Sequence, residues 1–560
     1  MPEPNKPLEQ MTAQERLDLG RSYFKEGKFD KAIAAWSNIH RDDDPGTYAD
    51  AQFSLGAAYY AQEDWEQAIA AWSNIHRDDN PKTYAVAQFN LGVAYKDQNK
   101  RDKAIAAWSN ITRDDNPETY AWAQFNLGVA YKDQHKRDKA IAAWSNIHRD
   151  DNPETYARAQ LNLGKIYAKS KKVKEAKEAY RNAREFFYYE GERGYRIHEC
   201  PPEVIKKLRD IAKNTDKVLK SLQIIPKFES KVAHYSQPST AFSLFGDEKN
   251  DKNPSNFRLN TIRGVNDPTE GLVLRDYWDQ QGIPETIHTS NTATFVSCFT
   301  FNHDSLNQFR LYGKEDGREA TGVSLVFKEE FFSDQPDTLG FIAGPSIDPS
   351  NKSGENESGE AGKSESDNKI QLIAKSALYR CIYLDPETGY WTLAQRDKSN
   401  FYRQHKEKAE KKWKKYYKSL SKKEKSVNKH LFAKDKSVLS TLQSIFGKYQ
   451  GYSIKEKQHI LETIRFILLP LQYLVKHIAF QEEQECRIMY TTHLHDEKIH
   501  HDWEKQWMYV EYKEQVLPHI DKIWLSPGAA KYQDFFRILL DQGSGKSKVR
   551  ISQNPFRNKE

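Results

Sequence analysis

The stretch Ala-Ile-Ala-Ala-Trp-Ser-Asn-Ile at residues 32–39 decides the fold of the first third of the chain. The same eight residues return at Ala68, Ala104 and Ala140, so successive copies lie 36 residues apart. A fixed period of this length predicts stacked structural repeats, because each unit is too small to bury its apolar face alone.

Each unit contains two helical patterns, shown in one unit by residues 87–95 and 102–108, with a polar turn between them. Apolar residues recur every three or four positions in both patterns, which indicates amphipathic helices. Gly92 lies inside the first pattern, where glycine costs about 1 kcal/mol relative to alanine. Because this glycine recurs in every unit, we expect the second helix to approach it closely, with Ala104 at the contact. The equivalent glycines are Gly20, Gly56, Gly128 and Gly164.

Aromatic residues and prolines mark the end of each unit. We expect the aromatic residues to pack between helices and the prolines to end each second helix. The aromatic residues are Trp36, Trp72, Trp108, Trp144 and, in the fifth unit, Tyr180, and the prolines are Pro45, Pro81, Pro117 and Pro153.

The order Leu-Gly-x-x-Tyr, Ala, aromatic residue and Pro resembles the tetratricopeptide repeat over residues 15–194, in five units. The period is two residues longer than the usual 34, which places the extra residues in the Asp-Asp-Asn-Pro-Glu-Thr-Tyr connector. The resemblance implies an all-α superhelical solenoid over residues 12–194 that binds a protein or peptide on its concave face. The polar first-helix residues expected to line that face are Gln52, Gln88, Asn90, Gln124, Asn126, Gln160 and Asn162. A solvated helix face is the alternative interpretation.

Composition limits the class of protein. The chain has 560 residues, enough for two or three domains, and a net charge of +6, too small to require a nucleic-acid partner. Its four cysteines are far apart and follow no metal-binding spacing, which favours free thiols. The N-terminus has no apolar signal core, and the apolar run at 466–471 is too short to span a membrane. We therefore expect a cytoplasmic, bacterial-type protein that does not enter a membrane.

The pattern of apolar and polar residues changes after the repeats. Residues 195–231 predict a capping helix and a linker, and residues 232–530 predict an α+β effector domain with a mixed or antiparallel sheet. Residues 531–560 are expected to form a C-terminal tail. The expected strands lie at 257–261, 293–299, 322–327, 378–384, 507–510 and 520–525.

Two insertions interrupt this domain. Residues 346–369 are rich in Ser, Gly, Glu, Asn and Lys and are expected to be disordered. Residues 403–430 form a Lys-rich helical pattern in which Trp413, Tyr416 and Tyr417 alternate with lysines. Such a pattern can bind nucleic acid or an acidic surface. The alternative is a solvated arm that packs its aromatic residues on the domain.

Four motifs in the second domain carry residues suited to chemistry. They are His234-Tyr235-Ser236, the turn Asn266-Asp267-Pro268-Thr269-Glu270, the strand-like Ser297-Cys298-Phe299-Thr300 followed by Tyr312-Gly313, and Glu482 to Arg487. Their order resembles an uncharacterised bacterial domain family, which brings no assured function.

The early His-Tyr, the Ser/Thr-bearing strand and the late Glu-x-Glu are also distantly similar to ADP-ribosyltransferases. That resemblance implies NAD as cosubstrate, with Glu485 as the catalytic carboxylate and Glu483 orienting the acceptor. It further implies that His234 holds the NAD ribose and that Tyr235 or Tyr312 stacks on the nicotinamide. Ser297 or Thr300 would then brace the site. Each residue also has a structural interpretation, such as a strand-edge histidine or a solvated acidic helix end.

The histidines His493, His495, His500 and His501 offer zinc-type donors, but the interval also carries the pattern of a polar hairpin, and we expect no metal. The sequence thus favours a peptide-binding adaptor that carries an effector domain. An enzyme of ADP-ribosyltransferase type is the alternative, and a nucleic-acid-linked effector that uses the Lys-rich arm is a second one.

Overall fold

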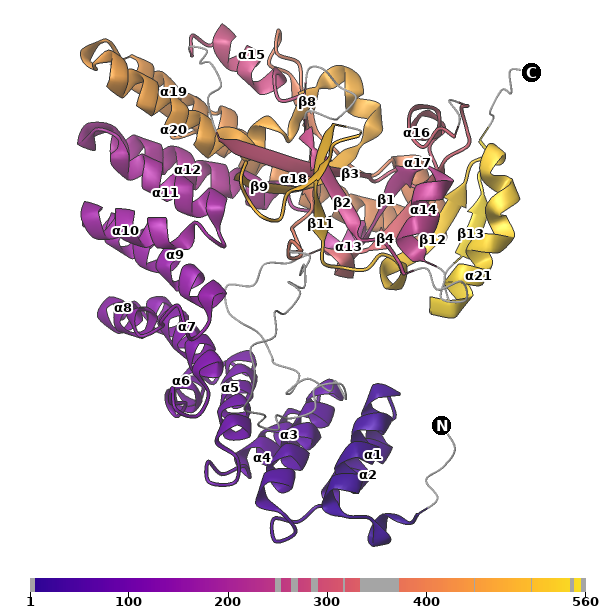
Figure 1. Cartoon of the computed structure of the whole chain (residues 1–560). Coiled ribbons are helices and arrows are strands. Elements are labelled where there is room, and N and C mark those ends of the chain that lie inside the picture. The colour runs from indigo at the N-terminus through magenta and orange to yellow at the C-terminus, as the bar shows by residue number, and fades with distance from the viewer. Residues whose placement is uncertain are drawn as a thin grey trace. The chain divides into compact units, whose positions relative to one another are not determined.

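The computed structural model describes residues 6–246, 253–262, 270–283, 291–315, 318–332, 372–447, 449–504, 506–543 and 548–554. The chain divides into two compact units, and the boundary in the N-terminal half lies between Tyr195 and Arg196. Figure 1 shows the helices of the N-terminal part in indigo and purple. The expected insertion at 346–369 falls outside the described residues.

The first unit consists of helices that alternate in length. After a short turn at Leu8–Gln10, each long first helix is followed by a shorter second helix. The helices are α1 (Ala13–Lys25), α2 (Phe29–Ser37), α3 (Pro45–Ala61), α4 (Trp65–Ser73), α5 (Pro81–Asp97), α6 (Arg101–Ser109), α7 (Pro117–Asp133), α8 (Arg137–Ser145), α9 (Pro153–Lys169) and α10 (Val173–Ala183). The expected all-α repeat solenoid is therefore confirmed. Helix α11 (Tyr188–Glu199) follows and crosses the boundary between the units.

A tryptophan packed on a glycine holds each helix pair together. A Cβ atom added at Gly92 would lie 2.1 Å from Nε1 of Trp108, so only glycine leaves room for the indole ring. The same indole donates a hydrogen bond of 3.1 Å to the carbonyl oxygen of Phe89, which leaves no polar atom of the buried ring unpaired. The expected packing role of Trp108 is confirmed, but the contact that requires the glycine is made by Trp108 rather than by Ala104.

The connector between units is built from capping and ion pairing. Pro81 is the first residue of α5, and the Asn80 side chain accepts a hydrogen bond of 3.1 Å from the Thr83 amide. The prolines therefore begin the next first helix, where a missing N–H group is harmless, instead of ending the preceding one. Arg77 in one connector pairs with Asp115 in the next at 2.9 Å, and the Asp115 side chain is 4 % exposed. This ion pair joins successive repeats, and it is made by residues of the connector that lengthens the repeat.

The second unit contains a helical part and a sheet part, each with its own core. The helical part holds α12 (Pro202–Leu222), α15 (Val273–Gln280), α18 (Ala409–Val427), α19 (Val438–Phe446) and α20 (Ile454–Gln472). Helix α12 occupies the position of the expected capping helix. Its buried residues Val204, Leu208 and Ile211 belong to the core of this helical part.

The main sheet has ten strands, with the order β10-β11-β2-β3-β1-β4-β12-β13 and with β9 and β5 branching from β3. A second sheet has the order β7-β6-β8. The strands are β1 (Lys231–Ser236), β2 (Phe257–Thr261), β3 (Thr292–Thr300), β4 (Val323–Lys328), β5 (Tyr379–Arg380), β6 (Ile382–Leu384), β7 (Trp391–Leu393), β8 (Val475–His477), β9 (Glu485–His493), β10 (His500–Asp502), β11 (Trp507–Tyr512), β12 (Ile520–Leu525) and β13 (Lys548–Ile551). Further helices of the second unit are α13 (Pro226–Glu229), α14 (Pro238–Phe245), α16 (Leu306–Leu311), α17 (Lys398–His405) and α21 (Gln533–Gly543). Antiparallel pairs dominate, with parallel pairs at β12–β13 and β6–β8, as the expected mixed sheet requires.

Two sequence-based boundaries need correction. The expected strand at 378–384 is two strands in different sheets, because the Cys381 amide donates to the Glu485 carbonyl oxygen while the Ile382 amide donates to that of Leu474. Residues 531–560 are not a plain tail, since β13 extends the main sheet beside β12. Among the described residues, no helix is long and apolar enough to cross a membrane.

Candidate functional site

A pocket opens in the main sheet where two strands part from β3. Strand β2 pairs with β3 only at Phe295 and Val296, and β1 pairs with it at Thr300. The edge of β3 between these pairs, at 297–299, faces a cavity of about 940 Å³. A cavity of this size lies within the range of small-molecule sites.

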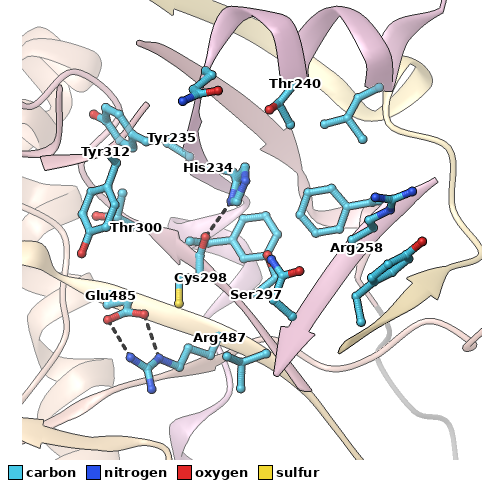
Figure 2. A pocket seen from close by; sticks show the side chains of 18 of the residues that line it. His234, Tyr235, Thr240, Arg258, Ser297, Cys298, Thr300, Tyr312, Glu485 and Arg487 are labelled. Carbon is cyan, nitrogen blue, oxygen red and sulfur yellow. Dashed lines mark hydrogen bonds and ion pairs between the residues drawn. The ribbon is translucent and has the colours of Figure 1, made fainter. Parts of the chain in front are cut away.

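The residues that the sequence singled out for chemistry meet at this pocket. All seven line it, although they come from β1, β3, β9 and the segments before β4 and β9. They are His234, Tyr235, Ser297, Thr300, Tyr312, Glu483 and Glu485. Figure 2 shows Tyr312, Thr300 and Glu485 on one side of His234 and Arg258 on the other.

The His234 side chain bonds to the edge of β3 at the place where neither β1 nor β2 pairs with it. Its Nδ1 atom lies 2.8 Å from the Cys298 carbonyl oxygen, and its ring packs edge-on against Phe257 at 5.2 Å. Burial lowers the pKa of His234, although the hydrogen bond to Cys298 opposes the shift. His234 is therefore neutral near pH 7, with Nδ1 as the donor, and its other ring nitrogen is an acceptor.

Tyr235 and Thr300 shape the wall of the pocket through structural hydrogen bonds. The Tyr235 hydroxyl donates to the Asn302 carbonyl oxygen at 2.8 Å and accepts from the Ser305 amide at 2.9 Å. Thr300 Oγ1 donates to the Glu483 carbonyl oxygen at 2.6 Å. Thr300 thus braces the acidic segment, whereas the hydroxyl of Tyr235 is committed to the protein itself.

Glu483 and Glu485 both face the pocket because the residue between them is turned away. Gln484 has a φ of 46°, in the left-handed region that residues other than glycine rarely adopt. Its side-chain oxygen accepts a hydrogen bond of 2.6 Å from the Gln395 amide, which fixes this conformation. Such a strained residue is typical of functional sites.

A buried network of charged groups surrounds Glu485. Arg487 Nε and Lys476 Nζ each lie 2.7 Å from its carboxylate oxygens, and Lys476 also contacts Glu483 at 2.5 Å. Arg487 contacts both carboxylate oxygens of Glu270 as well. The network therefore contains two cationic groups and three carboxyl groups.

The two neighbouring glutamates have opposite pKa shifts. Burial raises the pKa of Glu485, but Arg487 and Lys476 outweigh burial and bring it well below the ordinary value. For Glu483, burial outweighs the attraction of Lys476, and its pKa is raised. A pair of carboxyl groups whose pKa values are driven apart is the usual arrangement of an acid–base site.

Tyr312 joins this network through Glu483. Its hydroxyl donates to Glu483 Oε1 at 3.0 Å, and burial raises its pKa, so that it remains a hydrogen-bond donor. Gly313 follows with a φ of 73°, and a Cβ atom there would lie 2.3 Å from the Ser236 carbonyl oxygen. Only glycine allows the segment to turn so close to β1, which explains the Tyr-Gly motif.

Sequence reasoning missed part of the network. Lys476 was not identified, although a lone lysine after a long apolar run is a recognisable signal. Glu270 was noted only within a turn motif whose other residues, 266–269, lie outside the described residues. Arg487, the last residue of the motif from Glu482 to Arg487, contacts Glu485 directly.

In the Lys-rich segment, some of the aromatic residues pack on the domain, as the alternative interpretation of this segment predicts. Tyr416 is fully buried and donates to Glu229 Oε1 at 2.8 Å, and the Trp413 ring packs on Phe401. Tyr417 is 54 % exposed and lies in a groove of about 390 Å³ with Lys418 and other lysines of α18. A nucleic-acid role for this face stays a prediction.

The histidine-rich interval runs from the end of β9 at His493 into β10, where the His500 ring stacks on Tyr509 of β11. No cluster of three or more His, Cys, Asp or Glu side chains suited to a metal occurs within the described residues. All four cysteines are free.

In the first unit, the polar residues expected to bind a peptide fall into three groups. Asn90 and Asn126 are fully buried, so they cannot reach a ligand, and the expectation is wrong for both. Gln52, Gln88 and Gln124 accept hydrogen bonds from Asn74, Asn110 and Asn146 within their own repeats. Gln160 and Asn162 are partly exposed, and Gln160 lines a groove of about 840 Å³.

Comparisons with known proteins concern the first unit. Models of the tetratricopeptide repeat match residues 17–81 and 125–187, and a second such model matches residues 86–115. The N-terminal region therefore carries tetratricopeptide repeats, which are protein-interaction modules.

Solved structures with similarity include a crystal structure of MamA, with 25% identity over 30% of this chain and 92% of MamA, at a TM-score of 0.24. A MamA AMB-1 structure has 22% identity over 31% of this chain and 92% of its own, with a TM-score of 0.25. A thermophilic repeat protein of Thermus thermophilus has 19% identity over 31% of this chain and 90% of its own, with a TM-score of 0.21. No curated protein matches the chain.

Proposed function

We propose that this protein is a peptide-binding adaptor whose C-terminal domain binds NAD in the pocket between β1 and β2 and cleaves its nicotinamide–ribose bond. The observation that carries the proposal is the meeting of His234, Tyr312, Glu483 and Glu485 in one cavity. These residues are far apart in sequence, and the resemblance to ADP-ribosyltransferases draws on each of them.

The charge distribution suits this reaction. NAD carries a positive charge on the nicotinamide ring, and positive charge develops on the ribose as the bond breaks. A carboxylate that is kept ionised and oriented by Arg487 and Lys476 stabilises that charge. Glu485 fills this role, and the extra carboxyl group of the network adds to the attraction.

Glu483 and Tyr312 are suited to proton transfer. The bond between ribose C1′ and the ring nitrogen breaks with its electron pair leaving on neutral nicotinamide, and an acceptor oxygen or nitrogen then bonds to C1′. The acceptor loses a proton in this step. Glu483 takes it as a general base, because its raised pKa brings the carboxyl closer to neutral pH and Tyr312 holds it in place.

The repeats supply the interaction part of the proposal. Gln160 has no hydrogen-bond partner within the described residues, unlike its counterparts Gln52 and Gln88. Tyr156, Tyr167 and Arg149 line the same groove, which suits an extended peptide with polar and aromatic contacts. Peptides selected on the full chain should lose affinity in Gln160→Arg and keep it in Lys132→Gln, whose residue lies outside the groove.

Nicotinamide release from NAD by the full chain tests the catalytic part. Glu485→Gln should abolish release, and Tyr312→Phe should lower it. The matched control is Glu482→Gln, because Glu482 lies in the same acidic segment but faces a different cavity. Thermal unfolding of each variant separates loss of activity from loss of fold. A folded wild type that releases no nicotinamide, or a Glu485→Gln variant that releases it normally, overturns the proposed reaction.

A further inference from the structure

The pocket has two ends of different chemistry. Glu485, Glu483 and Tyr312 mark the acidic end, and Arg258 of β2 and Thr240 of α14 mark the other, with His234 and Ser297 between them (Figure 2). A ligand that fills both ends must carry a cationic or polar group at one and an anionic group at the other.

Arg258 is held in a position to receive an anion. Its guanidinium lies 4.1 Å from the centre of the Tyr509 ring, and its Nε atom lies 3.3 Å from Glu511 Oε1. The other carboxylate oxygen of Glu511 accepts a hydrogen bond of 2.9 Å from the Asn256 side chain. No described residue accepts a hydrogen bond from the terminal nitrogens of Arg258, and the side chain is 47% exposed. Two free terminal nitrogens on a fixed guanidinium suit bidentate binding of phosphate.

Ser297 gives an independent sign of a ligand. The residue is only 6% exposed, it lines the pocket, and its hydroxyl has no hydrogen-bond partner within the described part of the chain. A hydroxyl group in the wall of the pocket without a protein partner is available to hydrogen-bond a ligand that enters the pocket.

An exposed aromatic residue completes this end. Trp507, the first residue of β11, lines the pocket and is 53% exposed. A large aromatic ring left open at the rim of a polar cavity is suited to stacking on a nucleic-acid base. Asp502 of β10 also lines this region and offers an acceptor for a ribose hydroxyl or a base amino group.

We propose that this end of the pocket binds a nucleoside diphosphate group, with the phosphates at Arg258 and Ser297 and the base on Trp507. The inference extends the proposed function, because NAD contains such a group, and it places the adenosine diphosphate half opposite Glu485. It can also hold if the domain binds nucleotides without cleaving them.

Calorimetric titration of the full chain with ADP tests the inference. ADP should bind the wild type, and both Arg258→Gln and Trp507→Ala should weaken binding by about tenfold or more. Trp503→Ala is the matched control, because Trp503 lies on the same hairpin, is 83% exposed and does not line the pocket. Arg258→Lys keeps the positive charge but loses the two terminal nitrogens of the guanidinium, so this variant should bind ADP more weakly than the wild type does. Thermal unfolding shows whether each variant is folded.

The outcomes separate the two proposals. ADP binding that depends on Arg258 and Trp507, without release of nicotinamide from NAD, supports the nucleotide site and rejects the reaction. Absence of ADP binding to the folded wild type, or binding that neither substitution changes, overturns the nucleotide site whatever the result with NAD.

Discussion

The repeat unit and the pocket are both stabilised by buried polar atoms, but in opposite ways. In the repeats, Trp108 meets Gly92 and the Phe89 carbonyl oxygen, and nearly the same contact recurs with Trp36, Trp72 and Trp144. In the pocket, Arg487, Lys476 and three glutamates form one charged network, with more charged groups than the buried pair of Arg380 and Glu229. A neutral contact that is repeated stabilises a fold, whereas a buried charged network that lines a cavity is more costly and is more typical of a site.

The largest expected effect is on the charged network. Arg487→Met removes a cation that is 1% exposed and leaves Glu485 and Glu270 without it. Breaking a buried ion pair in this way should cost about 3–5 kcal/mol, measured by urea unfolding of the second unit. Arg537→Met is the control, since Arg537 is 55% exposed and its loss should change stability by less than about 0.5 kcal/mol. Equal effects of the two substitutions would show that the network is not a distinct stabilising element.

A smaller effect is expected in the repeats. Gly92→Ala forces a Cβ atom into the Trp108 indole and should cost about 1–3 kcal/mol through overpacking, despite the higher helix propensity of alanine. Gly46→Ala is the control, because its Cβ atom meets nothing closer than 3.6 Å. Tryptophan fluorescence during thermal unfolding gives the measurement. The cost should largely disappear in a Trp108→Leu background, and its persistence there would contradict the proposed contact.

Two adjacent tyrosines provide a third test, on the Lys-rich helix. Tyr416→Phe removes the donor to Glu229 and the acceptor for the Arg396 amide, and should cost about 1–3 kcal/mol. Tyr417→Phe changes an exposed ring and should have almost no effect on urea unfolding. If both substitutions are neutral, α18 is not anchored to the domain through Tyr416.

The smallest expected effect concerns pH. Burial, with a contribution from Lys522, lowers the pKa of His303 from 6.5 to about 3. The unfolded chain therefore takes up a proton at His303 before the folded chain does, and stability falls as the pH drops from 6.5 towards 3. The loss at pH 5.5 should be about 1 kcal/mol. His303→Gln should remove this part of the difference between the melting temperatures at pH 7.5 and 5.5. An unchanged difference would contradict the assignment.

The repeats were the more predictable region, for physical reasons. Every copy of the eight-residue stretch makes the same local contacts. The period, the helices and the aromatic packing can therefore be predicted from that stretch. The error about Ala104 arose because periodicity shows which positions need a small residue but not which side chain fills the space. Asn90 and Asn126 were misplaced for the same reason, since a polar residue type alone does not reveal burial.

The pocket was predictable only in its residue types. Glu485 lies opposite Thr300 in the pairing of β9 with β3, a register set by contacts between distant segments. No local pattern shows that β1 and β2 diverge at Ser297, or that Lys476 of β8 reaches Glu485. Strand β13 was missed because a short strand of four residues, two of them basic, carries little apolar signal.

A crystal structure of the full chain with a non-cleavable NAD analogue would show directly whether the pocket binds NAD. We expect the nicotinamide ring between Tyr312 and Glu485, the diphosphate at Arg258, and the adenine on Trp507. An analogue bound outside the pocket between β1 and β2, or bound in it with its two ends reversed, would contradict both proposals.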